Sequence, residues 1–340
     1  MEQLEPASPR TAEPASPRTA EPAEQAAPAA PPLLHARAAR IAVDDVVAID
    51  ALTAATRGDR VLCAGDAGAL FAAITGVPFS ALRRPARAGA ADDAGDAAPG
   101  EARVVAGRLE VAGRDVARSA HRAASGAAPL DPPLPLAWTA DAYVGWGARL
   151  AGASPRAAAE MVAPALARVG LAASRKRALS ALALPERRAL VLAQAIVTAP
   201  AVLIAEDPLV GLDGAAAAFV LAALAGATEG RRALLTAARL DVEGPRGALV
   251  RGATDVLVLA GGELAFSGTF AEIAAGSRLY AVTVRTNAEL LREELAARGI
   301  ALRGGPVRFA AALPEGATTR DVVLAATRCR AAIVELTPLF

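Results

Sequence analysis

The sequence predicts an α/β protein with a mainly parallel, helix-covered sheet, followed by a smaller α+β unit. Strand-like apolar runs alternate with helical stretches through residues 46–276, the order expected for parallel strands joined by helices. The chain has 340 residues, which favours two domains at about 150 residues each. From about residue 277 the elements become shorter and alternate more closely, so we expect the second unit there.

Two low-complexity segments interrupt this pattern. Residues 1–34 carry the octapeptide EPASPRTA twice, at Glu5–Ala12 and Glu13–Ala20. A segment so rich in Pro, Ala, Ser and Glu cannot bury a core, so we expect a disordered spacer, with a specific docking role as the alternative. The segment Arg83–Arg103 is predicted to be a surface loop.

The N-terminal part of the ordered chain predicts short strands and one helix. Strands in residues 46–65 flank the turn Arg57-Gly58-Asp59 and end in RVLCAG. A glycine-containing turn and a helix from about Ala69 follow, an arrangement that can offer backbone N–H groups to a phosphate. Residues 104–116 read as a hairpin.

Residues 139–230 are predicted to be mostly helical, with a strand at 201–205. The longest apolar run, Ala189–Ala205, is broken by Gln194, Thr198 and Pro200, so it indicates a helix, a turn and a buried strand rather than a membrane span. Further strands are expected at 232–240 and in a hairpin on Gly261-Gly262. The C-terminal unit is predicted as strand, helix, strand, helix and strand over residues 277–340.

Composition excludes several functions. The net charge of +1 and 3% aromatic residues give no basis for nucleic-acid binding. Cys63 and Cys329 form no CxxC, which favours buried thiols in a reducing compartment. The two histidines, His35 and His121, have no ligand-spaced neighbours, so neither a zinc site nor a histidine triad is expected. The N-terminal segment lacks the apolar core of a signal peptide, and a cytoplasmic protein is predicted.

The stretch AVLIAEDPLVGLD, Ala201–Asp213, carries the main chemical signal. An apolar strand runs into two adjacent carboxylates, then a proline and a Gly-Leu-Asp turn. Together with VVAIDALTAATRGDRVLCAG, the segment Leu130–Gly152, LALPERRALVLAQ and GGELAFSGTFAEI, in that order, it resembles the nucleotide-binding subunit of ATP-binding cassette (ABC) transporters. The resemblance is nearest to subunits of ABC-2 type exporters and covers roughly residues 40–273.

The resemblance implies a P-loop NTPase-like (ABC ATPase) core over residues 35–276, with a helical subdomain at about 139–190 and a C-terminal extension at 277–340. It also implies positions for each part of an ATP site. The P-loop falls on Gly65, Asp66, Ala67, Gly68 and Ala69. This loop has no Lys, and the single lysine of the chain, Lys176, is far away in sequence. This loop has two interpretations. Either the Gly65 and Gly68 N–H groups keep some contact with phosphate, or the segment is a plain strand–helix turn.

The other implied positions also depart from the family pattern. Leu130 takes the Q-loop position, which Asp131 could fill only if the loop shifts, and Ala238 takes that of the switch histidine. The signature falls on Leu182, Ala183, Leu184, Pro185 and Glu186, without its two glycines. The Walker B acids are Glu206, which would hold any Mg²⁺, and Asp207, at the general-base position; the D-loop Gly211, Leu212 and Asp213 is intact.

These features lead to a hypothesis about function. The chain is expected to be a degenerate cassette subunit with little or no ATPase activity of its own, for which ATP and Mg²⁺ are ligands implied only by the resemblance. The expected partners are a transmembrane permease, which would hold the chain at the inner membrane face, and a second cassette. One alternative is an asymmetric pair in which this chain supplies a weak site. The other is a non-catalytic scaffold.

Overall fold

The computed structural model describes residues 30–79, 100–118, 122, 124–241, 244–274 and 278–338. The predicted spacer at 1–34 therefore lies almost entirely outside the described residues, as do most of the predicted loop at 83–103 and His121. In the part of the chain that is described, no helix has the length and apolar character needed to cross a membrane.

Fourteen strands form three sheets among the described residues, and all of the strands expected from the sequence are present. The first sheet has the order β2-β1-β4-β5, the central sheet β10-β9-β3-β8-β7-β6, and the third β12-β13-β11-β14. The strands are β1 (Leu34–Val43), β2 (Val46–Ala55), β3 (Arg60–Gly65), β4 (Ala102–Val111), β5 (Arg114–Asp115), β6 (Ser125–Ala128), β7 (Val202–Ala205), β8 (Arg232–Ala237), β9 (Asp255–Ala260), β10 (Glu263–Gly268), β11 (Arg278–Thr286), β12 (Ala301–Gly304), β13 (Arg308–Leu313) and β14 (Ala332–Pro338).

The central sheet is parallel except for β10, which returns antiparallel to β9 on the Gly261-Gly262 turn. This agrees with the predicted parallel sheet, whereas the other two sheets are antiparallel throughout. Strands β7 and β9 are buried at every residue, because a parallel strand between two layers has no solvent face. The carboxyl ends of β3, β7 and β8 lie at one edge of this sheet, which is where the predicted site residues follow.

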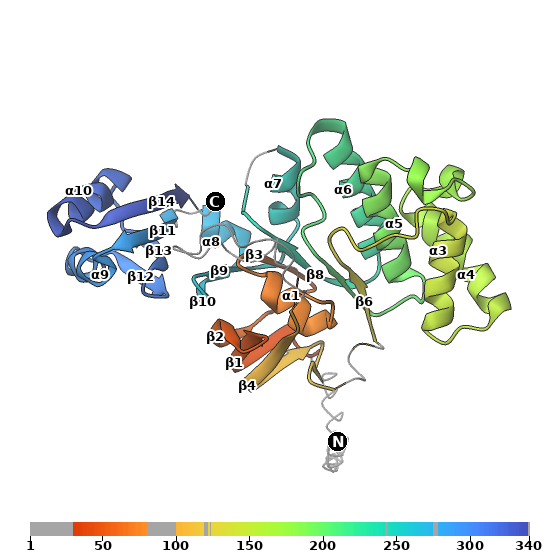
Figure 1. The fold of residues 1–340 in the computed structure, drawn as a ribbon, viewed down its shortest axis with the longest axis horizontal. Helices are drawn as coiled ribbons and strands as arrows, with labels where there is room; N and C mark the ends of the chain where they lie inside the picture. The colour runs from red at the N-terminus through yellow and green to blue at the C-terminus, as the bar shows by residue number, and fades with distance from the viewer. Residues whose placement is uncertain are drawn as a thin grey trace, which may run out of the picture. The chain divides into compact units, whose positions relative to one another are not determined.

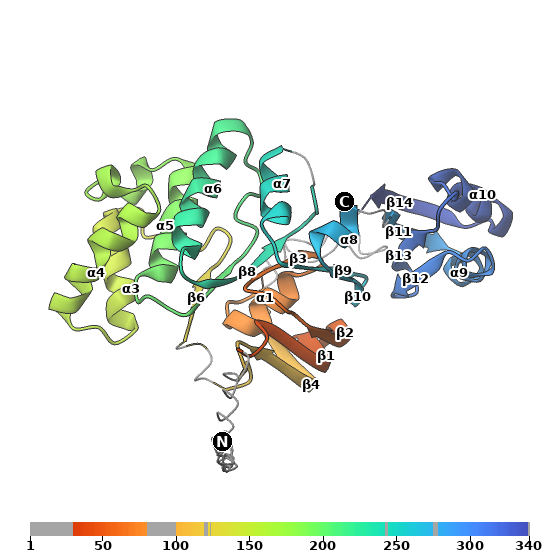
Figure 2. The ribbon, with the colours of Figure 1, turned by 180° about the vertical axis from the view of Figure 1, so that it is seen from behind.

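Helices cover both faces of the central sheet, and three of them gather beside the edge strand β6 (Figures 1 and 2). This helical group contains α3, α4 and α5; α1 packs between the central and the first sheet, where their side chains share one apolar cluster. The helices are α1 (Gly68–Thr75), α3 (Ala140–Leu150), α4 (Pro155–Arg168), α5 (Leu184–Ile196), α6 (Gly214–Thr228), α7 (Gly244–Arg251), α8 (Phe270–Ala274), α9 (Ala288–Ala297) and α10 (Thr319–Cys329), with short 3₁₀ turns at Ala172–Ser174 and Leu179–Ala181.

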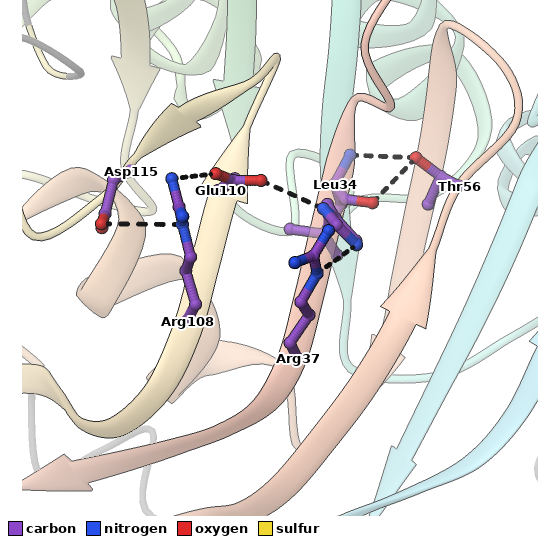
Figure 3. Close-up of polar contacts among 7 residues, drawn as sticks. Leu34, Arg37, Thr56, Arg108, Glu110 and Asp115 are labelled. Carbon is purple, nitrogen blue, oxygen red and sulfur yellow. Dashed lines mark hydrogen bonds and ion pairs between the residues drawn. The ribbon is translucent and has the colours of Figure 1, made fainter.

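Polar side chains join the strands of the first sheet, as Figure 3 shows. Arg37 Nε donates to His35 Nε2 at 3.2 Å, and His35 Nδ1 lies 3.0 Å from Glu110 Oε2. An arginine can only donate, so His35 Nε2 is the acceptor of the Arg37 contact. Arg108 continues the chain of contacts to Glu110 at 2.6 Å and to Asp115 at 3.9 Å. Both ring nitrogens of His35 therefore make contacts within the first sheet.

The third sheet, together with α9 and α10, has its own apolar cluster, which includes Val282, Leu291, Phe309 and Val322. We call residues 278–338 the C-terminal unit. Two residues of its sheet also pack against the central sheet, since Leu279 and Ala310 belong to the same buried cluster as Ala260 and Ala265. In both ribbon views the β9–β10 hairpin lies beside β12 (Figures 1 and 2), and backbone contacts join the two.

Candidate functional site

The turn between β3 and α1 is closed by its own backbone. Gly65 has φ +83°, and a Cβ placed on it would lie 2.1 Å from the Leu259 carbonyl oxygen, so only glycine fits. The Asp66 N–H donates to Leu259 O at 3.0 Å and the Ala67 N–H to Gly65 O at 2.8 Å. Two N–H groups of the predicted phosphate-binding turn are thus already bonded to carbonyl oxygens. Gly68 and Ala69 begin α1.

The Asp66 side chain is held by the C-terminal unit. Its Oδ1 pairs with Arg308 Nη1 at 2.9 Å, and its Oδ2 accepts the Gly261 N–H at 3.0 Å. Burial raises the pKa of Asp66, and the Arg308 guanidinium and the Gly261 N–H oppose that rise without cancelling it. A carboxylate therefore occupies the turn where the resemblance would put phosphates.

The two acids after β7 each bond to a different predicted position. Glu206 is 5% exposed, and its Oε2 accepts the Leu130 N–H at 2.9 Å. Asp207 Oδ2 accepts the Ala238 N–H at 2.9 Å. The structure thus brings the acid pair together with the predicted Q-loop and switch positions. Both contacts go to backbone N–H groups, which any residue at 130 or 238 other than proline could supply.

Asp207 lies in an unusual backbone conformation. Its φ is +33°, and its N–H donates to the carbonyl oxygen and the hydroxyl of Thr236 at 3.1 and 3.2 Å. Burial raises the pKa of Asp207; the Ala238 N–H, Arg246 and Arg188 oppose the rise, and Asp241 adds to it. A raised pKa would suit a general base, but this carboxylate is already bonded to the strand it faces.

Arg188 is a member of this region that the sequence analysis missed. It is 6% exposed on α5, and its Nη2 lies 3.0 Å from Asp131 Oδ2 while its Nη1 lies 3.4 Å from the Asp207 carbonyl oxygen. A signal was available, because an arginine within the apolar face of a helix needs an internal partner. Asp131 is thereby bonded to α5.

The signature positions form a helix N-terminus. Leu182 is buried, and the Ala183 N–H donates to Glu186 Oε2 at 2.9 Å, while Leu184 and Pro185 open α5. Glu186 Oε1 also meets Arg177 at 2.6 Å and the Ser174 hydroxyl at 3.1 Å. Burial raises the pKa of Glu186, but these hydrogen bonds and the charge of Arg177 outweigh burial and lower it. Pro185 has no N–H to offer an anion.

The D-loop positions form a separate turn before α6. Gly211 has φ +69° with no atom within 4 Å of an added Cβ, Leu212 is buried, and Asp213 stands at the N-cap of α6. Gly211 is exposed, and no atom of the described residues lies within 4 Å of a Cβ added there, so this turn is accessible from outside.

The residues present do not fit a magnesium–nucleotide group. Over the described residues, no group of three or more His, Cys, Asp or Glu side chains could hold a metal ion. At the β3–α1 turn a phosphate would meet the Asp66 carboxylate and two N–H groups that are already bonded. We therefore derive no reaction step through ATP.

A hollow of about 340 Å³ lies between the loop after Leu130 and α5. Its lining includes Asp131, Leu134, Leu136, Leu184 and Arg188. Leu136 and Leu184 are 51% and 41% exposed, and nearby Trp138 and Trp146 are 38% and 45% exposed with their rings in edge contact at 5.9 Å. Large apolar side chains thus gather on the accessible surface of the helical group.

Comparison with solved structures identifies the fold as that of ABC-transporter ATP-binding cassettes. The chain is similar to cbiO1 from Clostridium perfringens, described as part of the ABC transporter complex cbiONQ. The two match with a TM-score of 0.54 and 18% sequence identity, and the match covers 72% of this chain and 91% of cbiO1. It is similar to a bacterial Atm1-family ABC exporter with ATP bound: TM-score 0.52, 20% identity, 73% of this chain and 41% of that one.

A third solved structure, the ATP binding subunit of an ABC transporter, matches with TM-score 0.51 and 15% identity over 87% of this chain and 99% of that one. The sequence matches no protein-family model, and no curated protein is significantly similar to it. At these identities the comparisons define the fold: an α/β, P-loop NTPase-like cassette.

Proposed function

We propose that this chain is a cassette subunit of a membrane transporter, of the ABC-2 exporter type, which acts by docking rather than by hydrolysing ATP. The observation that carries this proposal is the state of the acidic groups of the site. Asp66, Glu206 and Asp207 are each bonded inside the chain, to Arg308, to the Leu130 N–H and to the Ala238 N–H. The turn that would hold phosphate also carries the Asp66 carboxylate and no lysine, so it lacks the positive charge that a triphosphate needs.

The partner that best suits the cassette fold is a transmembrane permease, with a second cassette of the same or another kind. The exposed apolar residues beside the 340 Å³ hollow support a binding surface there for a cytoplasmic segment of that permease. The accessible D-loop turn at Gly211 supports contact with a second cassette. The chain would then lie at the inner face of the membrane through its partner.

Nucleotide binding by the purified chain is the first test. A ligand present at 100 times its dissociation constant stabilises the folded state by about 2.7 kcal/mol, which a thermal melt detects easily. We expect no shift of the melting temperature with ATP and Mg²⁺, and no phosphate release. Mg²⁺-dependent turnover that is abolished by Asp207→Asn would refute the proposal. Binding without turnover would instead support the asymmetric pair, in which this chain supplies a weak site.

Docking is tested separately by co-expressing this chain with a transmembrane permease, where the gene for one lies beside the gene for this chain. Leu136→Asp is expected to abolish co-purification with that permease. Val105→Asp is the matched control, because Val105 is similarly exposed, at 46%, but lies on β4 of the first sheet. Equal recovery of both variants would argue against this surface, and absence of any permease complex would favour a stand-alone scaffold.

A further inference from the structure

We propose that the β3–α1 turn of this cassette is an internal docking surface whose ligand is the chain's own C-terminal unit. The surface consists of Asp66 and the Gly261-Gly262 turn, and the unit contributes Gly304, Arg308 and Glu335; we call this set the joint. The position that would bind phosphate in a nucleotide-dependent cassette thus binds a guanidinium instead.

Charge complementarity is the first argument for the joint. Arg308 lies 242 residues from Asp66 in sequence, yet its Nη1 is 2.9 Å from the Asp66 carboxylate, and its Nη2 lies 4.0 Å from Glu335 Oε2. Glu335 is in turn fixed by the Thr283 hydroxyl at 2.9 Å. One cation of the C-terminal unit is therefore shared between an acid of the cassette and an acid of its own sheet.

Close backbone approach is the second argument. A Cβ added to Gly261 would lie 2.1 Å from the Arg308 carbonyl oxygen, and one added to Gly304 would lie 2.9 Å from the Ala260 carbonyl oxygen. The Gly304 N–H also donates to Glu263 Oε2 at 3.0 Å. Glycines stand where the two backbones meet, which is how a close-packed contact between two chain segments is built.

Exclusion of phosphate follows from the same contacts. The Asp66 carboxylate binds Arg308 and the Gly261 N–H, and the backbone N–H of Asp66 is bonded to Leu259. An anion at this turn would meet the partly buried Asp66 carboxylate, which repels it, and the Arg308 guanidinium is already paired with that carboxylate. The proposal of the joint goes beyond the proposed function and does not depend on permease binding.

Hydrogen exchange of the purified full-length chain tests the joint, because the Gly261 N–H donates directly to Asp66. In Arg308→Ala, exchange in peptides covering residues 255–268 and 306–313 is expected to accelerate about tenfold or more, the effect of losing one charge-assisted hydrogen bond. Arg232→Ala is the matched control: Arg232 pairs with Asp59 at 2.8 Å inside the cassette and is comparably shielded, at 21% exposed against 30% for Arg308. Equal exchange of these peptides in the two variants would overturn the proposal.

Three further arms keep the proposal falsifiable if Arg308→Ala unfolds. The double variant Asp66→Arg, Arg308→Asp should restore slow exchange in residues 306–313, and failure to restore it there would overturn the joint; residues 255–268 should stay fast, because arginine cannot accept the Gly261 N–H. Gly261→Ala should accelerate exchange in these two peptides more than Gly299→Ala does. Gly299 has a similarly positive φ, but no atom lies within 4 Å of a Cβ added to it. Inorganic triphosphate should leave exchange of residues 65–75 unchanged in the wild-type chain, and protection there would show that the turn accepts phosphate after all.

Discussion

At the residue scale, the two adjacent acids after β7 play different structural parts. Glu206 is almost fully buried and joins the end of β7 to the loop at Leu130. Asp207 is less buried, takes a positive φ and joins the same point to the end of β8. Both carboxylates therefore act as acceptors for backbone N–H groups at the carboxyl edge of the central sheet, where unpaired N–H groups would otherwise be costly.

Replacing Asp207 by Asn should stabilise the chain increasingly as the pH rises. Burial raises the pKa of this carboxyl above its ordinary value of 3.8, so the folded state holds the proton more tightly than the unfolded state. The contribution of the Asp207 carboxyl to the free energy of unfolding is therefore largest below its ordinary pKa. This contribution is lost as the pH rises through the raised pKa. Asn keeps an acceptor for Ala238 without the charge.

Urea denaturation of wild type and Asp207→Asn between about pH 4 and pH 8 measures this difference. Asp213→Asn is the control for the substitution itself, since Asp213 is exposed and makes no side-chain cap bond. If Asp207→Asn is instead less stable at the upper end of the range, the negative charge itself stabilises the end of β8.

The two thiols should differ sharply in reactivity. Cys63 is 0% exposed in β3, and burial raises its pKa to about 12, whereas Cys329 is partly exposed at the end of α10. A thiol reagent at pH 8 should modify Cys329 and leave Cys63 unmodified, because its thiolate fraction is lowered roughly a thousandfold. Native Cys329→Ser should show no fast-reacting thiol, and denaturant should release one. A fast thiol in that variant would mean that β3 opens readily.

At the element scale, glycines mark the places where helices cross most closely. An alanine Cβ at Gly226 of α6 would lie 2.0 Å from the Arg168 carbonyl oxygen of α4. An alanine Cβ at Gly145 of α3 would only touch Val162, at 3.4 Å. Replacement of glycine by alanine is therefore expected to cause a clash in α6 and to be accommodated in α3.

Gly226→Ala should destabilise the chain by about 1–3 kcal/mol through overpacking. Gly145→Ala should stabilise it by about 0.5–1 kcal/mol, because alanine is the better helix former. Chemical denaturation of both variants against wild type measures the two changes. Equal effects of the same sign would mean that α4 and α6 can move apart at little cost.

The sequence patterns were sufficient for most elements and insufficient for a few. Strand β7 and the β9–β10 hairpin are continuous apolar runs beside turn residues, and both form as predicted. Strand β6 was missed because its four residues, Ser125–Ala128, are all small and carry no pattern. Strand β1 was missed because bulges near Ala36–Ile41, with φ +44° at Ala38, break its alternation.

The candidate site was predictable where its residues follow one strand or where the resemblance supplied a position, as at Leu130 and Ala238. Glu206 and Asp207 follow one strand, so a local pattern finds them. The Asp66–Arg308 contact joins positions 242 residues apart, and no local property of Arg308 distinguishes it from the other arginines of the chain. That contact depends on how the C-terminal unit packs, and it decides what the β3–α1 turn can bind.

At the scale of the whole molecule, the C-terminal unit shares buried surface with the cassette. Leu279 and Ala310 pack in the cassette core, while Leu291 and Val322 pack in the unit's own cluster. Polar contacts at the joint add to the apolar ones. Elements that share a core in this way are expected to unfold together rather than as separate domains.

Leu291→Ala tests this cooperativity with a probe far from the mutation in sequence. Leu291 is 0% exposed within the C-terminal unit, so its truncation should cost about 2–5 kcal/mol. The only two tryptophans, Trp138 and Trp146, lie in and just before α3, so their fluorescence reports the cassette alone. We expect the urea midpoint from tryptophan fluorescence to fall together with the midpoint from far-ultraviolet circular dichroism. A fluorescence midpoint that stays at the wild-type value would mean that the C-terminal unit unfolds independently and that the joint carries little of the coupling between them.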